Sequence, residues 1–145
     1  MIVFWQLMKR LSRQIISLAQ AEALKVALKA YAPYSGFRVG AALIMQDYTI
    51  YTGSNVENRS YGLTICAERV AIATAITHGR KDFLALILYT PDASQAIPPC
   101  GACRQVISEF TSPSFPIYFT KDGKRFIKKT IAQLYPFDSL HELAK

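Results

Sequence analysis

PCGACRQ (residues 99–105) carries two of the chain's three cysteines, and CAER (residues 66–69) carries the third. The three are Cys66, Cys100 and Cys103. Four soft ligands close a structural zinc site, whereas three leave a coordination position open for water, as in a catalytic zinc site. Glu68 adds a carboxylate that can handle the protons of an activated water. The two stretches therefore predict one open Zn²⁺ site in each chain.

The spacing of these residues indicates how they meet. Cys100 and Cys103 are three apart at the start of a predicted helix, so both sulfurs can face one metal. Cys66 opens another predicted helix, and helix N-termini stabilise thiolates. Cys66 and Glu68 are two apart, and such residues point in different directions on a regular helix. Either Glu68 reaches the site from another side, or the first helical turn is irregular.

The sequence allows two alternative interpretations of these residues. The cysteine pair could be a redox motif or two buried thiols. The third cysteine with its own glutamate opposes both, and a redox motif would follow a first strand, not a double proline. Arg69 and Arg104 each follow a site residue. They either donate to ligand sulfurs and draw negative charge off the metal, or are ordinary surface arginines.

Length and composition favour one soluble domain over residues 1–145. An odd cysteine count fits a reducing compartment, and no apolar run reaches membrane-spanning length, so we expect a cytoplasmic protein. The apolar start, Met1 to Leu7, lacks the preceding positive charge of a signal peptide. Residues 1–10 are instead interpreted as a possible N-terminal extension.

The net charge of +7 raises the question of a nucleic-acid partner. The basic residues are dispersed, however, and no phosphate-binding glycine loop or stacking platform accompanies them. We therefore interpret the charge as a solvated basic surface and expect neither nucleic acid nor membrane as a partner.

The pattern of apolar residues predicts alternating helices and strands. Strands are expected over residues 37–45, 49–55, 83–89, 117–120 and 125–128. Helices are expected over residues 11–31, 66–77, 101–110, 130–135 and 139–144. Asp122-Gly123 favours a hairpin, which makes the last two strands antiparallel. The fold class predicted is α/β, a three-layer α/β/α sandwich around a five-stranded mixed sheet.

Three of these segments carry predictions about burial. The helix over residues 66–77 is apolar nearly all round and should be largely buried, ending at Gly79. The strand over residues 83–89 should be covered on both faces. The helix over residues 11–31 should turn an apolar face inward. That face consists of Ile15, Leu18, Ala19, Leu24, Ala27 and Leu28.

The CAER and PCGACRQ motifs together resemble those of the zinc-dependent cytidine deaminases. YSGFRVGAA (residues 34–42) resembles the segment before that family's first strand, and NVEN (residues 55–58) resembles its sugar-binding motif. The resemblance implies hydrolysis of cytidine and deoxycytidine to uridine and deoxyuridine plus ammonia, in pyrimidine salvage. It also implies that the three cysteines bind Zn²⁺ and that Glu68 shuttles protons between the water, N3 and the leaving amine.

The resemblance also assigns the walls of the pocket. Phe37 would pack near the base, although it could be a core aromatic. Asn55 and Glu57 would bind a ribose hydroxyl, although they could be turn and surface residues. The backbone of Ala67 would help to read the pyrimidine.

Two features choose among branches of this family. Nucleic-acid-editing members usually carry His where Cys66 stands, and their last two strands run parallel. Cys66 and the hairpin at Asp122-Gly123 therefore favour the free-nucleoside type. The alternatives are a deaminase of a modified pyrimidine nucleoside or nucleoside antibiotic, of the blasticidin type, and a non-catalytic zinc module that binds nucleic acid.

The resemblance implies a homotetramer, but the C-terminal segment departs from the family pattern. Small members place an aromatic residue from this segment in a neighbour's active site, at the position of Ser139. Either Phe137 or Leu140 replaces it, or the contact is absent. Tyr61, close to Arg59, lies in a region that the family uses at subunit contacts and is a second candidate for an inter-subunit pocket.

Overall fold

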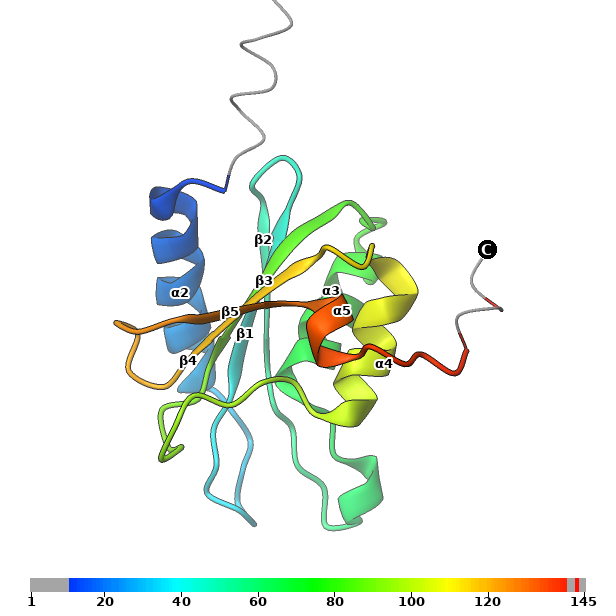
Figure 1. Ribbon diagram of the computed structural model, residues 1–145. Coiled ribbons are helices and arrows are strands. Elements are labelled where there is room, and N and C mark those ends of the chain that lie inside the picture. Colours follow the sequence, from blue (N-terminus) through cyan, green and yellow to red (C-terminus); the bar gives the residue numbers. More distant parts are fainter. Residues whose placement is uncertain (1–10, 141–142, 144–145) are drawn as a thin grey trace, which may run out of the picture.

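The computed structural model of the chain describes residues 11–140 and 143 (Figure 1). Five strands form one sheet in the order β2-β1-β3-β4-β5. They are β1 (Gly40–Met45), β2 (Ile50–Ser54), β3 (Phe83–Tyr89), β4 (Pro116–Thr120) and β5 (Ile127–Thr130). β1 runs antiparallel to β2 and β3, β3 runs parallel to β4, and β4 runs antiparallel to β5. The sheet is therefore mixed, as predicted.

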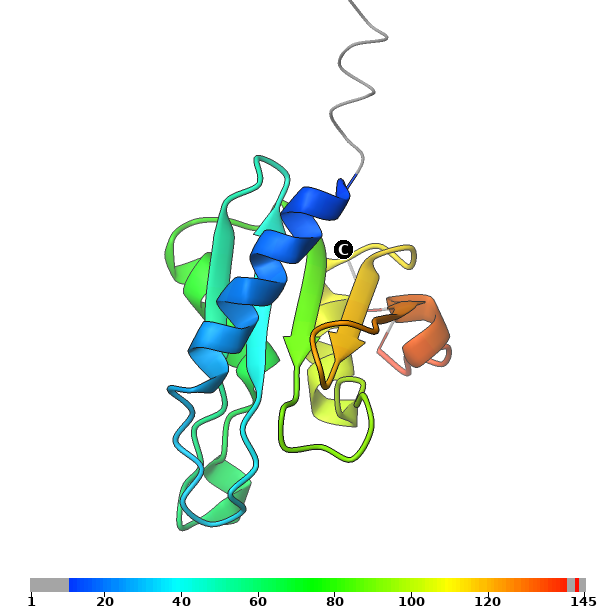
Figure 2. The ribbon, with the colours of Figure 1, turned by 90° about the vertical axis from the view of Figure 1, so that its left-hand side faces the viewer.

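Helices cover both faces of this sheet (Figures 1 and 2). They are α2 (Arg13–Ala27), the 3-10 helix η1 (Tyr61–Leu63), α3 (Ala67–Thr77), α4 (Gly101–Phe110) and α5 (Ile131–Leu134). One buried cluster lies between α2 and the sheet, and a larger one lies between the sheet and α3 and α4. These three layers confirm the predicted α/β/α sandwich.

The inward face of α2 corrects the sequence prediction. Its fully buried residues are Ala19, Ala23 and Ala27. Leu18, Leu24 and Leu28, predicted to face inward, are 53%, 38% and 64% exposed. A Cβ added at Gly40 of β1 would lie 1.9 Å from the carbonyl oxygen of Ala23. The helix backbone thus approaches the sheet so closely that only alanines fit, and the leucines are left outside.

The connection between β4 and β5 is longer than a tight hairpin. Asp122 accepts hydrogen bonds from the backbone N–H groups of Lys124 and Arg125, at 2.8 and 2.9 Å. Gly123 has a φ of +70°. This side-chain-stabilised loop extends past Arg125, so β5 begins at Ile127, two residues later than predicted.

The remaining elements follow the predictions closely. α3, β3 and α4 lie within one residue of the predicted bounds, and Gly79 ends α3 with a φ of +73°. β1 begins at Gly40 rather than at residue 37. Residues 1–10 lie outside the described part, as does half of the predicted helix over residues 139–144. No helix among the described residues is both long and apolar enough to cross a membrane.

Candidate metal centre

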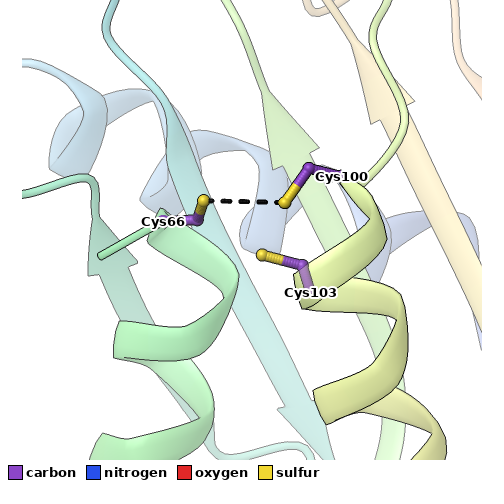
Figure 3. Close-up of side chains that lie close together, drawn as sticks. All are labelled: Cys66, Cys100 and Cys103. Atoms are coloured by element: carbon purple, nitrogen blue, oxygen red, sulfur yellow. Dashed lines mark hydrogen bonds between the residues drawn. The ribbon is translucent and has the colours of Figure 1, made fainter. Parts of the chain in front are cut away.

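The three cysteines lie at the N-termini of two helices. Cys66 is the N-cap of α3 and Cys100 is the N-cap of α4, both with extended backbone, and neither side chain caps its helix. Cys103 lies in the first turn of α4. The three sulfurs point toward one another (Figure 3) and lie within 4.8 Å of one another. The positive ends of two helix dipoles therefore meet at one cluster of thiols.

The cluster has the geometry and chemistry of a zinc site. Thiolates bind Zn²⁺ at about 2.3 Å, and two corners of a tetrahedron of that size are about 3.8 Å apart. The Sγ atoms of Cys66 and Cys100 are 3.8 Å apart. Cys103 is buried and Cys66 is half-buried, whereas Cys100 is exposed. Residues that fit the metal therefore lie together, with solvent access on the Cys100 side.

The electrostatics of the thiols favour an anion at Cys66. A hydrogen bond from Cys103, followed by the contact with Arg69, lowers the pKa of Cys66 to about 5. The same hydrogen bond raises the pKa of Cys103, as does burial. The cluster thus holds a thiolate at one N-cap before any metal charge is considered.

Glu68 is buried beside these thiols. Its side chain is 5% exposed, and burial, followed by the charge of Cys66, raises its pKa to about 7. Cys66 stands outside α3 as its N-cap, whereas Glu68 lies in the first turn of that helix. The two residues therefore do not have the fixed angular offset of helical neighbours. A carboxyl group with this pKa can both accept and release a proton near neutral pH.

The two arginines predicted near the metal differ in their contacts. Arg69 Nη2 donates to Cys66 Sγ at 3.7 Å and to the carbonyl of Thr64 at 3.1 Å. Arg104 donates instead to the carbonyls of Pro99 and Leu134, each at 2.7 Å. Arg69 thus contacts a predicted ligand directly, whereas Arg104 holds the backbone that precedes Cys100.

The predicted sugar-binding residues hold a loop in this structure. Asn55 is buried, its Nδ2 donates to the carbonyl of Phe37 and its Oδ1 accepts from the N–H of Val39, both at 2.8 Å. Glu57 accepts from the N–H groups of Tyr34 and Ser35 and from the Ser35 hydroxyl. These bonds, with that from Ser35 the largest contribution, lower the pKa of Glu57.

A small pocket lies next to this loop. It has a volume of ≈ 330 Å³ and is lined by Tyr34, Ser35, Glu57, Tyr61 and Thr64. Phe37 is half-buried on the same loop, and Ala67 is fully buried at the first position of α3. The first N–H groups of a helix have no partner within the helix, so the N–H of Ala67 is suited to bind a ligand.

The two residues predicted at subunit contacts are the most exposed aromatics within the described residues 11–140 and 143. Tyr61 is 75% exposed and packs edge-on against Tyr34, with ring centroids 5.8 Å apart. Phe137 is 90% exposed and lines a ≈ 680 Å³ pocket between the C-terminal end of α4 and α5. The cysteines lie at the other end of α4, about 15 Å away along the helix. Phe137 is therefore remote from the cluster of its own chain, and Leu140 is exposed as well.

Sequence reasoning missed one contact near the site. Arg38 forms a two-pronged ion pair with Asp92, which is 54 positions away in the sequence. Arg38 lies in the YSGFRVGAA segment, but Asp92 belongs to no recognised motif, and only the pairing of β1 with β3 brings their loops together. The sequence carried no signal from which this contact could have been found.

Comparison with known proteins places the chain in a family. The sequence model described as "Cytidine and deoxycytidylate deaminase zinc-binding region" matches residues 14–119. A cytidine deaminase of Sporosarcina psychrophila is 47% identical over 116 residues, covering 80% of this chain and 85% of the relative. A blasticidin-S deaminase of Bacillus cereus is 32% identical over 105 residues, covering 68% of this chain and 74% of the relative.

A solved structure agrees with the sequence comparisons. The crystal structure of cytidine deaminase from Burkholderia pseudomallei superimposes with a TM-score of 0.78 at 39% identity, covering 82% of this chain and 94% of that one. The fold, the thiol cluster and the sequence thus indicate the same family, and Zn²⁺ is the cofactor that they imply. The chain belongs to the zinc-dependent cytidine deaminases.

Proposed function

We propose that this protein hydrolyses cytidine and deoxycytidine to uridine and deoxyuridine, with release of ammonia. The observation that carries the proposal is the buried carboxyl of Glu68 beside three convergent thiols. When bound by Cys66, Cys100 and Cys103, zinc lowers the pKa of a water molecule toward neutral pH and so supplies a nucleophile.

Glu68 handles the protons in this reaction. Hydrolytic deamination needs a group that takes a proton from the attacking water and gives it to N3, and then takes the second proton from the resulting hydroxyl on C4 and gives it to the departing amine. Glu68 can serve all of these transfers because it is not one of the metal ligands. Its burial excludes bulk water that would otherwise exchange these protons.

Asn55, Glu57 and Phe37 complete the binding site in this proposal. The amide of Asn55 has two N–H bonds and has given one to Phe37, which leaves one for a sugar hydroxyl. The carboxylate of Glu57 accepts three hydrogen bonds of about four that it can take. Phe37 would pack against the base, and the N–H of Ala67 would contact the pyrimidine.

The test is a substrate panel of cytosine, cytidine, deoxycytidine, CMP, blasticidin S and a single-stranded oligonucleotide, with ammonia release as the readout. Turnover of both nucleosides is expected. Blasticidin S is included because a deaminase of that antibiotic is among the relatives. Turnover of blasticidin S or the oligonucleotide without turnover of the nucleosides would reject the proposal. Zinc binding without turnover of any compound would favour the non-catalytic module.

Glu57→Gln tests the sugar contact separately. The variant should raise KM for nucleosides that carry the sugar hydroxyl, with zinc content unchanged. Glu109→Gln, the same change at an exposed acidic residue outside the lining of the ≈ 330 Å³ pocket, is a suitable control. An unchanged preference between nucleoside and free base would remove Glu57 from the sugar site.

Further aspects of the proposal concern the assembly and its setting. We propose one domain, a homotetramer, and a cytoplasmic role in pyrimidine salvage. The exposed side chains of Tyr61 and Phe137, each at the edge of a pocket, are available for subunit contacts. Three free thiols support a reducing compartment. Light scattering of the purified protein would detect the tetramer, and a monomeric mass would reject it.

A further inference from the structure

The loop over residues 32–39 is held by side chains rather than by a strand ladder. Every backbone N–H from Tyr34 to Val39 donates a hydrogen bond. Apart from contacts within the loop, the acceptors are the side chains of Glu57, Asp92 and Asn55. Phe37, the proposed contact of the base, lies in the middle of this loop. Its position therefore depends on those three side chains.

Asp92 accepts three hydrogen bonds, all of them from Arg38. Its Oδ2 accepts from both the backbone N–H and the Nε of Arg38, each at 2.9 Å, and its Oδ1 accepts from Nη2 at 2.8 Å. Two parallel bonds between a guanidinium and a carboxylate fix direction as well as distance. Both side chains are partly exposed, so the pair adds little to overall stability. Its effect is to fix geometry.

Asp92 belongs to the loop over residues 90–99, which leads to Cys100. That loop is itself held to β4, because Thr90 N–H donates to the carbonyl of Thr120 at 3.0 Å and Lys121 Nζ donates to the carbonyl of Ser94 at 2.8 Å. Asn55 and Glu57, in contrast, follow β2. Asp92 therefore connects the Phe37 loop to the segment that leads to Cys100, whereas Asn55 and Glu57 connect it to the segment that leads to Cys66.

We propose that Arg38 and Asp92 are positioning residues that set the distance between Phe37 and the metal centre. This inference rests on the proposed role of Phe37 as the base contact. The pair touches neither the base nor the metal ligands. It acts by joining the two loops, which lie at the same end of the sheet (Figure 1).

Arg38→Gln and Asp92→Asn test the proposal in the zinc-loaded protein. Each should raise KM for cytidine about three- to tenfold with kcat nearly unchanged, because contact with the base is present in both substrate and transition state. Calorimetry should show a parallel rise in Kd for the product uridine. Arg38→Lys keeps the charge but loses the fork, so it should rescue little of the loss.

A matched control exists at the opposite end of the sheet. Arg80 forms the same kind of fork with Asp82, at 2.8 and 2.7 Å, and also contacts Asp47 in the β1–β2 turn. Arg80→Gln removes a partly exposed fork far from the loops in question and should leave KM and Kd unchanged. The double variant R38Q/D92N should match the worse single variant, because residues that act as one unit are not additive.

The possible results separate this inference from the proposed function. Wild-type KM and uridine Kd in both R38Q and D92N would overturn the positioning role, as would a fall in kcat alone that tracks the loss of folded protein. Phe37→Ala decides which part has failed. If it raises KM while R38Q and D92N do not, only the positioning role is wrong. If Phe37→Ala also leaves KM unchanged, Phe37 is not the base contact. The positioning role of the ion pair and the proposed role of Phe37 are then both overturned.

Discussion

Glu68 combines a titratable carboxyl with almost complete burial, and its removal should separate binding from chemistry. Glu68→Gln keeps the shape and hydrogen-bonding size of the side chain but cannot take up or deliver a proton. We expect kcat to fall by about a hundredfold or more, the usual loss on removing a general acid–base group. Zinc content, measured by mass spectrometry, should stay at one ion per chain.

The control for this variant is the exposed carboxylate Glu109 on α4. Glu109→Gln removes the same charge far from the thiols and should retain wild-type kcat. A Glu68→Gln enzyme with nearly normal kcat would show that another group moves the protons.

Asn55 has a structural task that its sequence motif did not reveal. Its amide bridges Phe37 and Val39, so Asn55→Ala leaves a backbone carbonyl and a backbone N–H without this partner. The expected loss in free energy of unfolding is about 1–3 kcal/mol, measured by urea denaturation. Exposed Asn58, which accepts a single bond from the N–H of Ser60, is the control and should lose less than about 0.5 kcal/mol on mutation to alanine. Equal losses would mean that the Asn55 bridge adds no stability.

Individual residues thus differed in how far they could be predicted. Cys66, Cys100 and Cys103 could be found from spacing, because ligand chemistry restricts both residue type and separation. The sequence could not show whether Arg104 contacts a metal ligand, because its position next to Cys103 does not fix the direction of its long side chain. Asn55 and Asp92 hold a loop whose shape arises only after the sheet has formed.

At the level of elements, the contact between α2 and β1 should be intolerant of added volume. In Gly40→Ala the new Cβ would meet backbone atoms of Ala23 and Ala27, which cannot rotate away. Overpacking of this kind costs about 1–3 kcal/mol of the free energy of unfolding, measured by chemical denaturation. Gly62→Ala is a suitable control because nothing lies within 4 Å of the added Cβ. Similar midpoints for the two variants would mean that α2 shifts without cost.

The same contact explains why helix boundaries were easier to predict than helix orientation. The helix boundaries were predicted from local sequence, namely the helix-breaking residues after α3 and the cysteines that begin α3 and α4. The orientation of α2 is not local, because Gly40 admits a row of alanines and excludes the larger leucines. A rule that places the largest apolar residues inside therefore selected Leu18, Leu24 and Leu28 wrongly. β5 shifted for a related reason, since the carboxylate of Asp122 extends the preceding loop.

For the whole molecule, zinc should be a structural requirement as well as a catalytic one. The two N-caps that carry thiols make no capping hydrogen bond, and an ordinary cap contributes about 1 kcal/mol. Without metal, three thiols of which one holds a negative charge also remain in close contact. Removal of zinc with a chelator should therefore lower Tm, and Zn²⁺ should restore it whereas Mg²⁺ should not, because thiolates prefer soft metals.

Thiol titration provides the matching readout. A thiol-specific reagent should react readily with the half-buried Cys66 and the exposed Cys100 in the metal-free protein, and much more slowly in the zinc-loaded one. An unchanged Tm in protein shown to contain no zinc would contradict a structural role for the metal.

The loop over residues 32–39 has a consequence for the mobility of the site. Irregular segments normally exchange their amide hydrogens with solvent within seconds, but here each N–H from Tyr34 to Val39 is bound. These amides should exchange as slowly as those of a strand, and nucleoside should add little further protection. The loop around Phe37 would then be a preorganised part of the binding site, which selects substrates by their shape. It would not be a mobile loop that closes over the substrate after binding.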